Sequence, residues 1–308
     1  LSNTQAVNAM EDINKARPTS HSYFSQRLKL HYLDWGNESA PHMLLIHGIH
    51  DHCHTWDWVA QTMCSAFHVV VPDLRGHGDS DWAMGGAYGH IDDVYDIAQL
   101  VHQEELDPVH IIAHSLGGTL ACILAGIYPE KIASLTVLEG VGGMPGWYMR
   151  GNTTRQTLKY WIDNNRKLAG RSPRKYPSLA EAFQRMQKSN PHLDEQRARH
   201  LTIHGSNRNE DGTYTWKFDN YTHSRPPYDI PYEQIEELWR EITCPVLLIT
   251  ATEGYPHRIG QNDTAKHFRN VESALIERAG HWVHHDQLDE FLKVTQEFLQ
   301  RHFGLGVS

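Results

Sequence analysis

Short apolar runs alternate with helical patterns along most of the chain. Strands that are apolar throughout are typical of a parallel sheet with both faces covered, and helices between the strands supply that cover. The run at residues 27–35 instead alternates between apolar and polar positions, which predicts an edge strand. The predicted strands cover residues 27–35, 43–46, 69–71, 109–113, 133–138, 246–249 and 274–276, and the predicted helices cover residues 56–66, 91–106 and 289–302, with one more helix directly after residue 115. The chain is therefore predicted to be an α/β protein.

The alternation of strands and helices is interrupted between residues 143 and 231. This stretch has helical patterns, clustered Trp and Tyr, more Lys and Arg than Asp and Glu, and no strand run of the sheet-core type. We expect it to be a helical cap folded over the carboxyl ends of the strands, where open α/β sheets bind ligands. The predicted organisation is an N-terminal extension at residues 1–22, a core at 23–142 and 232–308, and the cap at 143–231.

Ser115 lies where a buried strand turns into a helix. The apolar run from Val109 to Ala113 is followed by His114, Ser115 and Leu116, and then by Gly117 and Gly118. Small residues two before and two after the serine let the strand and helix backbones approach closely while the hydroxyl is held outward. This pattern predicts a nucleophile elbow, with alanine at position 113 where glycine is usual.

Four motifs in order along the chain resemble the α/β-hydrolase fold family over about residues 23 to 302. They are Leu45-Ile46-His47-Gly48, Pro72-Asp73-Leu74-Arg75-Gly76-His77-Gly78-Asp79-Ser80, the elbow at Ser115, and Gly280-His281-Trp282. The resemblance is to the serine hydrolase and carboxylesterase type. Residues 216–219 and the run Glu253-Gly254-Tyr255 further resemble its serine hydrolase-like subgroup. The resemblance implies an eight-stranded, mostly parallel sheet, a cap that acts as a lid, and a catalytic triad of serine, acid and histidine.

A serine hydroxyl needs an imidazole to take its proton, and position selects His281 among the 23 histidines. His281 follows the last strand run and a small-residue turn, so it lies at the carboxyl edge of the sheet. The third member of the triad has two candidates. Most relatives carry an aspartate after the strand at 246–249, but Gly254 stands there and Glu253 is one residue early. Glu139 ends the strand at 133–138, the other location used in the family, and we favour it over the alternative Glu253.

A tetrahedral intermediate also needs N–H donors for its oxyanion. The family resemblance selects the backbone N–H groups of Ile49 and of Leu116. We further expect four side chains to contact substrate: His50, His114, Trp147 and Trp282.

A histidine-rich loop at residues 47–54 raises the question of a metal. Its histidines, His47, His50, His52 and His54, do not have the spacing of known zinc motifs. We therefore expect this loop to line the site, with no metal and no cofactor.

Composition limits the partners. The net charge of −9 disfavours nucleic-acid binding, and no apolar stretch is long enough to span a bilayer. Four scattered cysteines and no visible secretion signal predict a cytoplasmic location, although a leader trimmed before Leu1 would change that expectation. The expected partner is a small-molecule ester, and the sequence leaves monomer and dimer open.

The function favoured by these residues is hydrolysis of carboxylic esters through an acyl-enzyme on Ser115. A serine at the elbow disfavours the dehalogenase and epoxide hydrolase chemistries of the family, which need a carboxylate there. Lactones, amides, thioesters and carbon–carbon bonds remain open, because their cleavage shares the same intermediate. A small-molecule sensor with little turnover is the alternative from another class, since a fold alone does not settle function.

Overall fold

The computed structural model describes residues 16–85, 88–140, 152–224, 226–261 and 263–306. Its centre is a sheet of eight strands in the order β1-β2-β4-β3-β5-β6-β9-β10. The six strands from β4 to β10 in this order are parallel to one another, whereas β2 pairs antiparallel with both β1 and β4. The strands are β1 (Thr19–Ser25), β2 (Leu28–Asp34), β3 (His42–Ile46), β4 (His68–Pro72), β5 (Val109–His114), β6 (Ile132–Leu138), β9 (Val246–Ala251) and β10 (Val271–Ile276). This is the expected α/β-hydrolase architecture.

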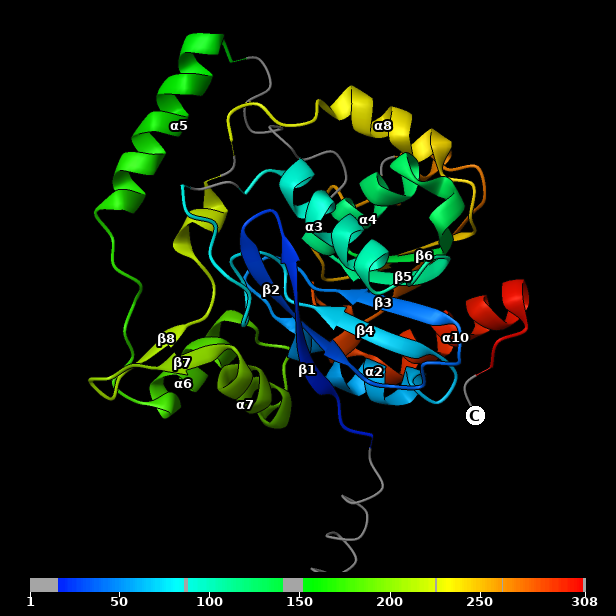
Figure 1. The fold of residues 1–308 in the computed structure, drawn as a ribbon, viewed down its shortest axis with the longest axis horizontal. Helices are drawn as coiled ribbons and strands as arrows, with labels where there is room; N and C mark the ends of the chain where they lie inside the picture. The colour runs from blue at the N-terminus through cyan, green and yellow to red at the C-terminus, as the bar shows by residue number, and fades with distance from the viewer. Residues whose placement is uncertain (1–15, 86–87, 141–151, 225, 262, 307–308) are drawn as a thin grey trace, which may run out of the picture.

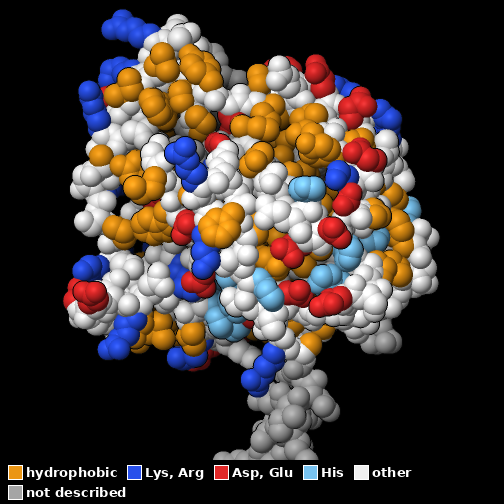
Figure 2. All heavy atoms as spheres, viewed as in Figure 1, with side chains coloured by type: hydrophobic (Ala, Val, Ile, Leu, Met, Phe, Trp, Pro, Cys, Tyr) orange, Lys and Arg blue, Asp and Glu red, His pale blue; other side chains and the backbone are white. Residues whose placement is uncertain are grey.

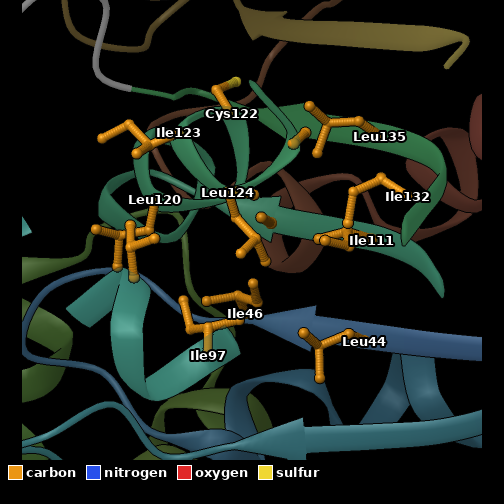
Figure 3. Close-up of a cluster of buried hydrophobic side chains, with 14 of the residues drawn as sticks. Leu44, Ile46, Ile97, Ile111, Leu120, Cys122, Ile123, Leu124, Ile132 and Leu135 are labelled. Atoms are coloured by element: carbon orange, nitrogen blue, oxygen red, sulfur yellow. The ribbon is translucent and has the colours of Figure 1, made fainter. Parts of the chain in front are cut away.

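Helices cover both faces of the sheet (Figure 1). One face packs against α3 (His90–Gln103), α4 (Leu116–Ile127) and α8 (Tyr232–Glu241), and the other against α2 (Asp57–Met63) and α10 (Leu288–Phe303). Figure 3 shows the first of these interfaces, where side chains of β3, β5 and β6 meet those of α3 and α4. Because both faces are buried, β4 and β5 are buried at every position, which explains their continuous apolar runs.

The amino-terminal edge of the sheet differs from the sequence prediction. The run at 27–35 was predicted to be an edge strand, and this is wrong because β2 lies between β1 and β4. The edge strand is β1, which begins at Thr19, four residues before the expected start of the core. Its first four residues are exposed and mostly polar, so it carries little of the apolar signal that identifies a strand.

In its described residues, the insertion after β6 contains three α-helices and a small hairpin. Helices α5 (Thr154–Ala169), α6 (Leu179–Ser189) and α7 (Glu195–His204) precede strands β7 (Ser206–Arg208) and β8 (Tyr214–Trp216), which pair antiparallel. The hairpin was not predicted; its turn contains Gly212 at φ +82°, a backbone conformation that favours glycine. In Figure 2 the basic side chains lie mostly over the side of the molecule that carries the cap.

Two further properties concern the environment of the protein. Within the described ranges, no helix has both the length and the apolar character required to cross a bilayer. The four cysteines, Cys53, Cys64, Cys122 and Cys244, are all free thiols.

Candidate active site

Ser115 lies at a sharp turn between β5 and α4. Its backbone has φ +52° and ψ −116°, a conformation that costs energy for any residue other than glycine. The turn requires Gly117, because a Cβ at that position would lie 2.6 Å from the carbonyl oxygens of Ile46 and His47. Gly117, two residues after the serine, therefore lets α4 approach the end of β3.

His281 reaches Ser115 from a loop far along the chain. The loop lies between β10 and the short helix α9 (Val283–Asp286), and the Gly280 N–H donates to Asp286 Oδ2 at 2.8 Å. The imidazole Nε2 lies 2.9 Å from Ser115 Oγ, within hydrogen-bond reach. Burial and the nearby positive charge of Arg258 lower the pKa of His281 to about 3, so the imidazole is neutral and can accept the serine proton.

Glu139 lies directly after β6 and approaches the other nitrogen of His281. Glu139 Oε2 is 3.4 Å from His281 Nδ1, and the residue is fully buried. The Ala251 N–H donates to Oε1 at 2.8 Å, and Arg258 Nε lies 3.3 Å from Oε2. Burial raises the pKa of Glu139, whereas these donors and the backbone of Tyr255 lower it. Like Ser115, Glu139 has a positive φ, of +48°.

The alternative acid, Glu253, lies outside this arrangement. Its side chain is 53% exposed and its Oε2 lies 3.5 Å from His192 Nε2. The neighbouring Gly254 explains why no acid stands at the usual family position. A Cβ on Gly254 would lie 2.4 Å from Glu139 Oε2, so the space of that side chain is filled by the Glu139 carboxylate.

The loop after β3 lies against the elbow. A Cβ on Gly48 would lie 3.1 Å from Ser115 Cβ, so the backbone beside Ile49 is close to the serine. Buried His47 fixes this loop, because its Nδ1 donates to the Gly48 carbonyl at 2.7 Å and its Nε2 accepts from the Leu74 N–H at 3.0 Å. Within the described part of the chain, no hydrogen-bond acceptor faces the N–H of Ile49 or Leu116.

A cleft opens beside His281 between the core and the cap. Its lining comes from the segment after α6, from the turn after β9 and from the loop that carries His281; the lining residues are Ser189, Asn190, Pro191, His192, Glu253, Tyr255, Gly280, His281, Trp282 and Asp286. Trp282, expected to contact substrate, is among them. The aromatic ring of Tyr255 lies 5.0 Å from that of His281.

Of the other three residues expected to contact substrate, His114 and His50 are not among the lining residues of this cleft. His114 is buried, and its Nε2 donates to the His281 carbonyl at 2.8 Å. This contact makes His114 a support for the His281 loop. His50 packs its ring against Phe218 and His223 of the insertion, at centroid distances of 4.3 and 4.0 Å. Trp147 lies outside the described residues.

Arg258 is the site residue that sequence reasoning missed. It lies in the loop after β9, is 8% exposed, and contributes a positive charge to both Glu139 and His281. No motif marks it. The available signal was Glu139 itself, because a carboxylate at the end of a buried strand requires a cation or several N–H donors near it.

The chain belongs to the alpha/beta hydrolase fold family, whose model matches residues 41–288. It is 24% identical over 281 residues to the esterase Rv0045c of Mycobacterium tuberculosis, covering 87% of this chain and 85% of that protein. It is also 24% identical to a serine hydrolase-like protein of Danio rerio, covering 86% of this chain and 83% of that protein. Among solved structures, the thioesterase domain from the curacin biosynthetic pathway superposes with a TM-score of 0.77 at 21% identity, over 90% of this chain and 99% of that chain. The protein is thus a hydrolase-fold relative of esterases.

Proposed function

We propose that the protein is a serine hydrolase that cleaves carboxylic esters of small molecules. Ser115 Oγ attacks the ester carbonyl while His281 Nε2 takes the hydroxyl proton. The N–H groups of Ile49 and Leu116 hold the oxyanion of the tetrahedral intermediate. His281 then gives its proton to the leaving alkoxide, and the acyl group stays on Ser115. Water, deprotonated by His281, attacks the acyl-enzyme and releases the carboxylic acid and free Ser115.

The observation that carries this proposal is the 2.9 Å contact between Ser115 Oγ and His281 Nε2, at a strained strand-to-helix turn. Glu139 supports it from the other side of the imidazole, where a carboxylate orients the ring and stabilises the imidazolium that forms during the reaction. The Glu139–His281 distance of 3.4 Å is long, as catalytic hydrogen bonds often are without substrate.

The esterase relative favours an oxygen ester as the substrate. The thioesterase domain with the same fold supports thioesters as a second class, because a thioester passes through the same tetrahedral and acyl-enzyme species. The lining of the cleft combines Tyr255 and Trp282 with His192 and Glu253, which suits an acyl or alcohol part that is neither fully apolar nor strongly charged.

A pre-steady-state assay with p-nitrophenyl acetate tests the proposal. We expect a burst of p-nitrophenol close to one equivalent per protein chain, followed by slower turnover, and we expect Ser115→Ala to abolish both. Replacing a distant hydroxyl, in Ser65→Ala, is the matched control and should leave the burst unchanged. Turnover that persists in Ser115→Ala would remove the proposed nucleophile. Binding of ester without any burst in the unmodified protein would favour a small-molecule sensor.

A further inference from the structure

Three histidines and an aspartate meet where the cap contacts the core, apart from the triad. His54 and Asp57 come from the start of the α2 region, and His200 and His204 from α7 of the cap. One potential ligand atom from each of the four residues lies within 4.8 Å of all the others. His54 Nδ1 and His200 Nε2 are each 2.9 Å from the same oxygen, Asp57 Oδ2. The ring of His204 stacks on that of His54 at 3.8 Å.

The four side chains are arranged like the ligands of a metal ion rather than like scattered surface histidines. His200 and His204 are four residues apart on one helix, so both side chains point from the same face. His54 and Asp57 are three residues apart in a helical segment and share a face for the same reason. Two such pairs facing each other place four donors around one point.

Two residues of this cluster have polar atoms that make no hydrogen bond within the described residues, and such atoms can coordinate a metal ion. Asp57 Oδ1 is buried and has no hydrogen-bond partner among the described residues, although buried polar atoms are seldom left unpaired. The ring nitrogens of His204 likewise have no hydrogen-bond partner in the described ranges. A cation between the four side chains would satisfy both residues at once.

We propose that these residues bind one divalent transition-metal ion of the zinc class, which fastens α7 of the cap to the core. The ligands are His54 Nδ1, a carboxylate oxygen of Asp57, His200 Nε2 and one ring nitrogen of His204. Imidazole and carboxylate are ligands that zinc accepts in tetrahedral sites, at about 2.0 to 2.2 Å. Because the protein supplies all four ligands, no position remains open for water, and the ion has a structural role.

Binding needs only small movements. His54 and His200 exchange their hydrogen bonds to Asp57 for bonds to the ion, and each neutral ring then carries its proton on the other nitrogen. The four ligand atoms now lie within 4.8 Å of one another. Rotation about the side-chain bonds brings them closer together around the ion.

Two other clusters have ligand-type side chains, but their chemistry differs. In the group of His31, Cys53 and Asp73, both carboxylate oxygens already accept hydrogen bonds, Oδ1 from the Cys53 N–H and Oδ2 from His31 Nδ1, so neither is left without a partner as Asp57 Oδ1 is. In the group of Asp51, His114 and His284, all three residues are fully buried and His114 Nε2 donates to the His281 carbonyl. Neither cluster brings four ligands together.

The test uses the full chain without an affinity tag, stripped with a chelator, and His204→Gln as the main variant. We choose His204 because it makes no hydrogen bond within the described residues, so its loss should leave the melting temperature of the metal-free protein nearly unchanged. Zinc affinity is measured by competition with a chromophoric chelator, and cobalt(II) is added separately to record its visible absorption. His102→Gln, at an exposed position on α3, is the matched control for non-specific histidine binding.

We expect the unmodified protein and His102→Gln to bind one equivalent of zinc, to melt at a higher temperature with zinc, and to give the intense visible bands of tetrahedral cobalt(II). We expect His204→Gln to lose about 100-fold or more in zinc affinity and to lose both the thermal shift and the cobalt bands. Equal zinc binding by His204→Gln and the unmodified protein would overturn the proposal. Zinc that weak chelators remove from both the unmodified protein and His102→Gln would overturn it as well. The measurements do not involve ester turnover, so failure here leaves the proposed esterase activity intact.

Discussion

The ends of β6 and β9 each carry a carboxylate near His281, and the two ends have opposite environments. Glu139, after β6, is fully buried and receives the Ala251 N–H and the charge of Arg258. Glu253, after β9, is more than half exposed and faces His192 at the cleft. An exposed carboxylate is stabilised by water and orients a neighbouring imidazole weakly. A buried one, held by fixed donors, keeps its geometry and interacts strongly with a positive charge.

The two strand ends also meet in one close steric contact. Glu139, from the β6 end, fills the space beside Gly254 of the β9 end, where a Cβ would lie 2.4 Å from Glu139 Oε2. A glycine at the expected position of an acid is therefore informative. In this chain it marks the space that the Glu139 carboxylate fills.

The largest effect separates the two acids directly. We expect Glu139→Gln to lower kcat by about 10³-fold or more, because the amide cannot stabilise the imidazolium and can favour the wrong histidine tautomer. We expect Glu253→Gln, the matched substitution at the exposed position, to change kcat by less than about twofold. Steady-state hydrolysis of p-nitrophenyl acetate by both variants measures the difference. A loss confined to Glu253→Gln would reverse the assignment.

A smaller effect should follow from filling the space beside Glu139. The added methyl of Gly254→Ala meets the carboxylate and displaces it from His281, which we expect to lower kcat by about 10- to 100-fold. Gly170→Ala adds a methyl where nothing lies within 4 Å and serves as the control. Circular dichroism and melting temperature identify any general loss of structure. Unchanged kcat in Gly254→Ala, with Glu139 still needed, would show that the carboxylate tolerates displacement.

The smallest effect concerns pH. Burial and the charge of Arg258 lower the pKa of His281 to about 3, so the neutral imidazole that catalysis needs persists well below the ordinary histidine range. The acid limb of kcat/KM should therefore lie below pH 6. Removing the positive charge in Arg258→Gln favours the protonated imidazole and should move this limb upward by about one pH unit. A limb that moves downward, or stays in place, would contradict the proposed electrostatic role of Arg258.

Much of this molecule could be predicted from its sequence because local rules and global topology agree. Continuous apolar runs marked the buried strands, and glycine at position 117 marked a tight strand-to-helix turn. Chain order then placed His281 and Glu139 at one sheet edge, since parallel strands bring their carboxyl ends together. The structure puts the groups predicted from these rules within hydrogen-bond reach of one another.

The parts that could not be predicted depend on contacts between distant segments. Strand β1 is mostly polar on its outer half, so its pairing with β2 has little periodic signal. Arg258 is recognisable only once Glu139 is known to be buried. His54 joins His200 and His204 only through the docking of α7 on the core, and no spacing within residues 47–54 could reveal it.

The central claim is that Ser115 becomes acylated during turnover, and mass spectrometry tests it most directly. The protein is mixed with p-nitrophenyl acetate, quenched with acid within the burst, digested and mapped. We predict a mass increase of one acetyl group on the peptide that contains Ser115, located at that serine by fragmentation and absent from Ser115→Ala. Turnover with an unmodified Ser115, or with the acetyl group on another side chain that Ser115→Ala retains, would contradict the account.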